Sequence, residues 1–340
     1  MLRVRSTILH SLCLLLALLI LASNVAAAEL PLVRIAHGAF SEKIAALWVG
    51  AEQGLFRKHG VNVEVVNIRS GPQTMAALVS GDIQIAYTIP GSVVSASASG
   101  LDVAFFAGLV NRADGDFIAH ANIKSPEDLK GKRIGVQSIG GGVWSMAMLA
   151  IEHLGLETNR DKMTVMIIGD SPVLAQSLEQ GGIEATYLNY THSRSPKEKG
   201  FPVLLDLGKA PIPYQGLAAA TRRSYLKQNP QIADSLMRGF ADTVAFIHKP
   251  ANKELVVKAL AKNLRLKNLL EAETGYQTLQ WLYSLEIKPT LPGIQNMQRF
   301  LALTNPKVKN VKTEDVVDEA PWQRLQKSPF YRELVAAARG

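Results

Sequence analysis

The chain alternates short apolar runs with amphipathic stretches, and this rhythm begins near residue 33 and restarts near residue 116. Short runs of apolar and β-branched residues are typical of strands, whereas apolar residues recurring at helical spacing are typical of helices. Strands linked by crossover helices form a parallel sheet with helices on its faces. The alternation therefore predicts two α/β lobes, one from each run.

The predicted strands and helices can be assigned to the two lobes by position. The first lobe has strands at residues 33–38, 61–68, 82–88 and 102–110 and helices at 43–59, 71–81 and 91–100. The second has strands at 116–120, 132–136, 162–168, 183–189 and 201–208 and helices at 142–154 and 172–182, with a capped turn at 125–131. Further helices are predicted at 229–248, 253–264, 271–285, 297–302 and 323–338. We predict two doubly wound α/β lobes joined by two hinge strands: lobe 1 at 29–111 plus 215–340, with a helical C-terminal extension, and lobe 2 at 112–214.

Residues 1–28 contain the parts of a secretory signal peptide in the expected order. Arg3 and Arg5 form a basic start, residues 12–21 an apolar centre, and residues 26–28 an alanine cleavage site. We therefore expect export and cleavage of this segment. The single cysteine, Cys13, lies in the apolar centre rather than at the cleavage point. We expect no lipoprotein anchor and, in the mature chain, no disulfide or cysteine nucleophile.

The distribution of charged and histidine residues argues against several function classes. The formal net charge is +8, but the Lys and Arg residues are scattered and form no stripe with aromatic residues, so we expect no nucleic-acid binding. The histidines lie in separate predicted elements without metal-ligand spacing, and no nucleophile elbow is present. We expect no metal, no cofactor and no catalytic residue.

Ligands of open α/β sheets bind beyond the carboxyl ends of the strands, where loops lead into helix N-termini. This rule selects five loops, at residues 37–41, 70–74, 88–92, 138–144 and 189–191. Exposed N–H groups at such helix ends favour an anion or a carbonyl oxygen. The candidate ligand-binding residues are His37, Phe40, Ser41, Ser70, Gly71, Gln73, Thr88, Gly91, Ser92, Ser138, Gly140, Gly141, Gly142, Trp144, Asn189 and Tyr190.

Most of these candidates also fit a purely structural role. The serine and threonine hydroxyls are typical helix caps, and His37 is equally well a loop histidine bonded to the backbone. Phe40 and Trp144 are either aromatic plates against the ligand or ordinary core. Tyr187 and Tyr190 differ by three residues, so on a strand only one of them faces the cleft, and we expect Asn189 or Tyr190 there.

The loops contain few positive charges. Neither Lys43 nor Arg69 is clearly placed to face the cleft, which leaves Arg112 near the hinge as the one candidate for ion pairing. Glycines, hydroxyls and aromatic residues suit a small organic acid or a neutral ring better than a highly charged phosphate.

The stretch "QSIGGGVW", residues 137–144, has neither the lysine of a phosphate-binding P-loop nor the spacing of a dinucleotide fingerprint, because Ser145 stands where that pattern needs glycine. We expect a strand-to-helix turn in which residues 140–142 let the backbone approach a ligand closely.

Four phrases, in order, resemble a known family. They are "LWVGAEQGLFRKHGVNVEVV", "SGPQTMAALVSGDIQIAYT", "SPEDLKGKRIGV" and "SLEQGGIEATYLN". They resemble the periplasmic substrate-binding proteins of the nitrate, sulfonate, taurine and thiamine-precursor type, over about residues 33–249.

The resemblance implies a type II periplasmic-binding fold, an interlobe cleft and no catalysis. It also implies that a small solute of the sulfonate, carboxylate or heterocycle class is delivered to the inner-membrane permease of an ABC transporter. We expect a periplasmic monomer. Two alternatives remain: an enzyme of the same fold that makes pyrimidine or quinone precursors, and a solute receptor that is not coupled to an ABC importer.

Overall fold

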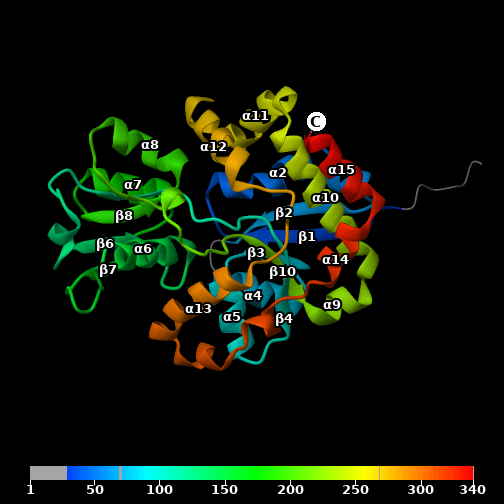
Figure 1. Ribbon diagram of the computed structural model, residues 1–340, viewed down its shortest axis with the longest axis horizontal. Helices are drawn as coiled ribbons and strands as arrows, with labels where there is room; N and C mark the ends of the chain where they lie inside the picture. Colours follow the sequence, from blue (N-terminus) through cyan, green and yellow to red (C-terminus); the bar gives the residue numbers. More distant parts are fainter. Residues whose placement is uncertain (1–28, 69–70, 268, 340) are drawn as a thin grey trace, which may run out of the picture. The chain divides into compact units, whose positions relative to one another are not determined.

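Two five-stranded mixed sheets form the centre of the protein (Figure 1). The computed structural model describes residues 29–68, 71–267 and 269–339, so the predicted signal peptide at residues 1–28 lies outside the described residues. Both sheets belong to the compact unit that begins at Leu32.

The first sheet has the strand order β2-β1-β3-β10-β4. Its strands are β1 (Leu32–His37), β2 (Asn62–Asn67), β3 (Ile85–Thr88), β4 (Val103–Gly108) and β10 (Ala218–Arg222). β1 is parallel to β2 and β3, as the alternation predicts, but β10 is antiparallel to β3 and β4. The direction of β10 was not predicted, because this strand enters from the second half of the chain rather than through a crossover helix.

The second sheet repeats this plan with the order β7-β6-β8-β5-β9. Its strands are β5 (Asp116–Ala119), β6 (Arg133–Val136), β7 (Thr164–Ile167), β8 (Ala185–Leu188) and β9 (Val203–Asp206). β6 is parallel to β7 and β8, whereas β5 is antiparallel to β8 and β9. Each sheet therefore contains one antiparallel strand that directly follows a crossing from the other sheet.

Helices cover both faces of the first sheet, because alternate strand residues point to opposite sides. On one side Ile35 and Tyr87 pack with α2 (Ala45–Glu52), α3 (Leu55–Lys58) and α10 (Pro230–His248). On the other side the strands pack against α4 (Gly71–Ser80) and α5 (Pro90–Ala98) (Figure 1). The helix predicted at 43–59 is divided, since Gly54 adopts a left-handed φ of 68° between α2 and α3.

Three helices accompany the second sheet: α6 (Gly142–His153), α7 (Ser171–Glu179) and α8 (Tyr190–Glu198). The first two were predicted within one or a few residues. α8 was not predicted, because its sequence is polar and contains Pro196. Asn189 begins α8 as a cap, since its side chain accepts a hydrogen bond from the backbone N–H of His192. The predicted capped turn at Ser125 is present as a short 3-10 helix, Pro126–Leu129, with Asp128 completing the capping box.

The remaining C-terminal helices are α9 (Arg223–Gln228), α11 (Lys253–Asn263), α12 (Leu269–Leu282), α13 (Leu291–Thr304), α14 (Ala320–Lys327) and α15 (Pro329–Arg339). α13 is longer than predicted, and the helix predicted at 323–338 is two helices, because Ser328 leaves the helical conformation before Pro329. α12 contacts α8, and α13 contacts both α5 and α6. These two helices therefore contact elements that accompany both sheets.

Two segments cross between the sheets side by side. Arg112 and Pro213 form an isolated antiparallel bridge, and the N–H of Gly216 donates to the carbonyl of Val110 at 2.7 Å. The side chain of Gln215 is fully buried, donates to the carbonyl of Val110 at 3.2 Å and accepts from the N–H of Thr290 at 2.7 Å. The returning crossing is thus attached to the start of α13. The lobe boundaries at residues 111/112 and 214/215 remain predictions.

We predict that Gly293→Ala strongly destabilises the protein. A Cβ atom at residue 293 would overlap the backbone of Tyr214 and Gln215, which cannot move as a side-chain end can. Overpacking costs about 1–3 kcal/mol in typical cores, and we expect at least the upper value here. Urea unfolding measures the change, with Leu303→Ala on the exposed side of α13 as control, since Leu303 is 75% exposed. Equal stability of the two variants would contradict the close approach.

Candidate functional site

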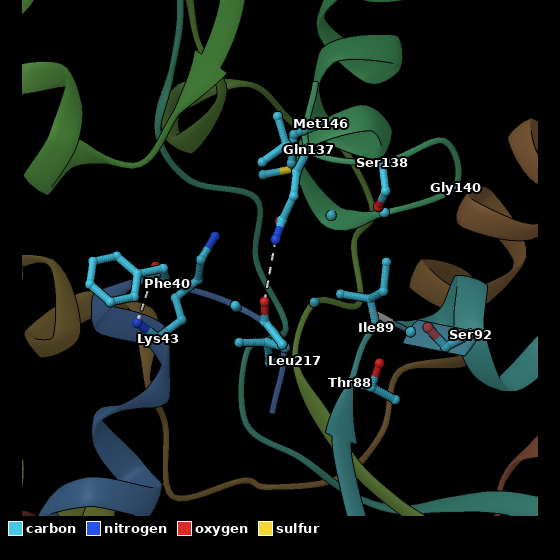
Figure 2. A pocket seen from close by; sticks show the side chains of 18 of the residues that line it. Phe40, Lys43, Thr88, Ile89, Ser92, Gln137, Ser138, Gly140, Met146 and Leu217 are labelled. Carbon is cyan, nitrogen blue, oxygen red and sulfur yellow. Dashed lines mark hydrogen bonds between the residues drawn. The ribbon is translucent and has the colours of Figure 1, made fainter. Parts of the chain in front are cut away.

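A cavity of about 140 Å³ lies where the carboxyl ends of strands from the two sheets meet (Figure 2). All five loops selected from the sequence contribute residues to it. Loops at the end of parallel strands gather at one edge of a sheet, which is why segments far apart in the sequence share one cavity.

The first sheet supplies the loops after β1, β2 and β3. The loop after β1 contributes Gly38, Ala39, Phe40, Ser41 and Lys43; the loop and helix after β2 contribute Gly71 and Thr74; and β3 with its following loop contributes Tyr87, Thr88, Ile89 and Ser92. Ser41 caps a 3-10 helix by accepting from the N–H of Lys43, so its hydroxyl both caps and lines the cavity.

The second sheet supplies the glycine-rich turn after β6. Residues 137–143 and Met146 line the cavity together with Ser171, Tyr187 and Asn189. Gly140 has a left-handed φ of 75°, which favours glycine, and Gly141 is the N-cap of α6. An added Cβ on Gly91 would lie 2.7 Å from the carbonyl oxygen of Gly140, so glycine at 91 allows α5 to touch this turn.

The crossing segment adds Tyr214, Gly216 and Leu217 to the lining. The side chain of Gln137 extends toward this region and donates to the carbonyl of Gly38 at 3.4 Å, a contact between the two sheets (Figure 2). The cavity is therefore bounded by both sheets and by the chain that joins them.

A buried ion pair lies beside this cavity. Lys43 Nζ donates to Asp114 Oδ1 at 2.8 Å and to the hydroxyl of Tyr187 at 2.9 Å. The Lys43 and Asp114 side chains are 10% and 0% exposed. Burial by itself lowers the pKa of Lys43, but the Asp114 carboxylate, together with Tyr187 and Tyr214, outweighs burial and holds that pKa well above its ordinary value. Lys43 is thus a cation that already has its counterion.

Glu42 is a second buried carboxyl group next to this pair. One oxygen accepts from the hydroxyl of Ser41 at 3.1 Å, while Oε1 has no hydrogen-bond partner among the described residues. Burial, reinforced by the negative charge of Asp114, raises the pKa of Glu42 to about 7. The carboxyl is therefore poised between its neutral and charged forms near neutral pH.

Most of the sequence-predicted residues are brought together at the cavity. Those that line it are Phe40, Ser41, Gly71, Thr88, Ser92, Ser138, Gly140, Gly141, Gly142 and Asn189. Gly91 lies behind the lining against Gly140, and the side chain of Gln73 is exposed. Ser70 and Arg69 lie outside the described residues.

Three other expected ligand-binding or ion-pairing residues lie elsewhere in the structure. Trp144 is 4% exposed in the core beneath α6, because the helix turns that side chain inward. Tyr190 begins α8 and donates to Asp206, so Tyr187 rather than Tyr190 lines the cavity. Arg112 is exposed in the crossing bridge, and it is Lys43 that lines the cavity.

His37 takes part in a neighbouring cavity instead. Its Nδ1 donates to the carbonyl of Ala39 at 3.1 Å, and its ring meets Trp48 edge to face. Burial lowers the pKa of His37 to about 4, so the imidazole is neutral at neutral pH.

Sequence reasoning missed several lining residues for identifiable reasons. The glycine turn is flanked by four lining residues that were not predicted: Gln137, Ile139, Val143 and Met146. The last two are three residues apart and lie on one face of α6. Tyr214 and Leu217 were expected only as hinge residues. Nothing local in the sequence places the crossing segment against the strand ends.

Among the described residues, no helix is both long and apolar enough to cross a membrane.

Residues 41–253 match the family model described as "NMT1/THI5 like". The chain is similar to the taurine-binding periplasmic protein of Escherichia coli (strain K12), with 24% identity over 233 residues that cover 66% of this chain and 69% of that protein.

Two solved structures resemble the chain in fold. The periplasmic aliphatic sulphonate binding protein SsuA of Escherichia coli has a TM-score of 0.68 and 20% identity, covering 84% of this chain and 97% of its own. The periplasmic nitrate-binding protein NrtA of Synechocystis PCC 6803 has a TM-score of 0.69 and 15% identity, and the alignment covers 90% of this chain and 91% of that protein. The predicted periplasmic-binding fold is confirmed.

We predict that Trp144→Ala lowers the free energy of unfolding by about 3–5 kcal/mol, because it empties a large site in a packed core. Urea unfolding measures this loss, with Trp281→Ala as control, since Trp281 is 37% exposed and should cost less. Unchanged stability together with weakened solute binding would instead place Trp144 against the ligand.

A second prediction concerns Glu42 and pH. The pKa of Glu42 is about 7 in the folded protein against 4.5 for the ordinary group, so the folded state binds more protons between these pH values. Its contribution to stability is therefore full at low pH and is lost as the pH rises from about 4.5 to about 7. Glu42→Gln should raise stability relative to wild type at about pH 8 and change it little at about pH 4.5.

Urea unfolding at both pH values tests this, with Glu286→Gln as an exposed control. A stability difference for Glu42→Gln that is the same at both pH values would contradict the protonation of Glu42.

Proposed function

Because the chain belongs to the NMT1/THI5-like family, we propose that it is an extracytoplasmic solute-binding protein that captures a small organic solute or anion and delivers it to an ABC-type importer. The observation that carries this proposal is the cavity built jointly by both sheets and by the segments that cross between them. Hinge closure around a ligand is a recognised transition of two-lobed binding proteins.

The lining supports a solute of modest size with few charges. A cavity of about 140 Å³ is close to the ~150 Å³ that accommodates benzene in an engineered protein core. Hydroxyl groups of Thr88, Ser92 and Ser138 and the N–H groups at the start of α6 are suitable donors to a sulfonate, carboxylate or heterocycle. Because Lys43 is already paired with Asp114, the first cavity offers the solute these neutral donors rather than a free cation.

The relatives support binding rather than catalysis. A taurine-binding protein and sulphonate-binding and nitrate-binding proteins are all described as periplasmic. We infer that this chain likewise works in the periplasm, after loss of residues 1–28, as a monomer with one solute per chain and an inner-membrane permease as its partner.

A thermal-shift screen tests this function directly. Sulfonates, carboxylates, nitrate, pyrimidines and aromatic acids are added separately to the mature chain. A solute present at a hundred times its Kd raises stability by about 2.7 kcal/mol by mass action. At least one class should raise the Tm, and no shift with any compound would count against solute binding.

For a solute found in this way, we predict that Ile139→Ala weakens binding about fivefold, since losing the apolar contact costs about 1 kcal/mol. Ile139 is 46% exposed and lines the cavity, so the protein's stability should change little. Ile167→Ala is the matched control, because Ile167 is 65% exposed on β7 and lies outside the lining. Isothermal titration calorimetry that gave equal affinities for both variants would exclude this cavity as the binding site.

A further inference from the structure

A second cavity, of about 280 Å³, adjoins the first. The two share Gly38, Phe40 and Gln137 in their linings. Two contacts join elements of the two sheets at this partition: the 3.4 Å hydrogen bond from the side chain of Gln137 to the carbonyl of Gly38 (Figure 2), and the ring of Phe40, whose centroid lies 6.1 Å from that of His192. That hydrogen bond is long, and the side chain of Gln137 has rotatable bonds, so the partition is able to move.

The walls of the second cavity are chemically different from those of the first. They carry one guanidinium, on Arg265, and one carboxylate, on Asp170, together with the amides of Asn67 and Asn263. His37 also lines this cavity but is neutral at neutral pH. Arg265 and Asp170 therefore supply its two charges.

Among the described residues, neither side chain has an ion-pair or hydrogen-bond partner. The Arg265 guanidinium is exposed, and Asp170 is the N-cap of α7 without a side-chain cap hydrogen bond, although its charge acts on the pKa of His192. Asn263, which also lines this cavity, donates to Glu52, and Glu52 also accepts from Lys262. Its charge is thus already matched by Lys262.

The backbone at Arg265 is unusual as well. Arg265 has a φ of 53°, and the N–H of Leu266 donates to the carbonyl of Ala261 at 2.9 Å, as in a helix-ending motif that usually has glycine. An arginine is disfavoured in this left-handed conformation.

We propose that the two cavities are compartments of one solute site and that the second binds a zwitterionic group, an ammonium and a carboxylate on the same carbon. A monoanion would set its charge against Asp170, a monocation against Arg265, and a neutral group would interact with neither charge. The uncharged remainder of the solute then occupies the first cavity. This proposal rests on the proposed function and names its solute class: a 2-amino acid with an uncharged side chain.

Isothermal titration calorimetry with matched probes tests the proposal. L-phenylalanine and L-leucine are compared with their analogues that lack the amino group, 3-phenylpropionate and 4-methylpentanoate, and with those that lack the carboxylate, 2-phenylethylamine and 3-methylbutylamine. At least one amino acid should bind ten times or more tightly than both of its analogues. Arg265→Gln should remove its advantage over the amine, and Asp170→Asn its advantage over the acid.

A matched pair of glycine variants separates charge from backbone effects. Lys162 has a φ of 54°, nearly that of Arg265, and lies outside both linings. Arg265→Gly and Lys162→Gly should therefore shift the Tm by similar amounts. Only Arg265→Gly should lose the preference for the amino acid over the amine.

Three results would overturn the proposal. Equal affinity of the amino acids and their single-charge analogues would contradict a zwitterion site in the second cavity but not solute binding itself. The same conclusion would follow if Arg265→Gln kept the preference for the amino acid over the amine, or if no amino acid bound while a compound of the thermal-shift screen did. If neither these probes nor any compound of that screen binds, the proposed function fails with it.

Discussion

The ion pair of Lys43 with Asp114 holds together the parts of the chain on which the site depends. Lys43 follows β1 of the first sheet, Asp114 lies on the first crossing, and Tyr187, which also accepts from Lys43, lies on β8 of the second sheet. Removing one member of a buried pair leaves an uncompensated charge, which typically costs about 3–5 kcal/mol. This contact therefore constrains where the strand ends of the two sheets lie relative to the cavity.

The same pair shapes the electrostatics of its surroundings. It places a cation at the cavity without leaving that cation free for a ligand, and its carboxylate helps to raise the pKa of the neighbouring Glu42. The first cavity consequently offers mainly hydroxyls, N–H groups and apolar side chains. The lining of the adjoining cavity carries the charged side chains of Asp170 and Arg265, which form no ion pair among the described residues.

Much of the fold follows from local sequence patterns, whereas part of the site does not. The β-α alternation predicts the parallel strands, and the strand-end rule selects all five loops, because both depend on chain direction alone. Those rules do not predict the antiparallel direction of β10 or the polar helix α8. Tyr190 does not line the cavity because α8 begins at this residue and ends the alternation of the preceding strand. Trp144 lies in the core because the helical phase of α6 turns its side chain inward.

The stretch "QSIGGGVW" forms the predicted turn between β6 and α6, and the structure adds a contact with α5; the approach of residues 140–142 to a ligand stays a prediction. Gly140 needs its left-handed conformation, and its carbonyl lies against Gly91 at the start of α5. This turn therefore serves as a contact between elements of the two sheets as well as a wall of the cavity. A side chain larger than that of glycine at residue 91 would prevent this approach.

The central claim is that one solute, held by both sheets, closes the cleft. Distances between spin labels measured by pulsed electron resonance test it most directly, because removal of residues 1–28 also removes Cys13, the only cysteine. Labels are attached through Asn159→Cys, near the second sheet, and Gln228→Cys, near the first, both at exposed positions. With a saturating solute the distance distribution should shift to shorter values and narrow. An identical distribution with and without bound solute would contradict the account.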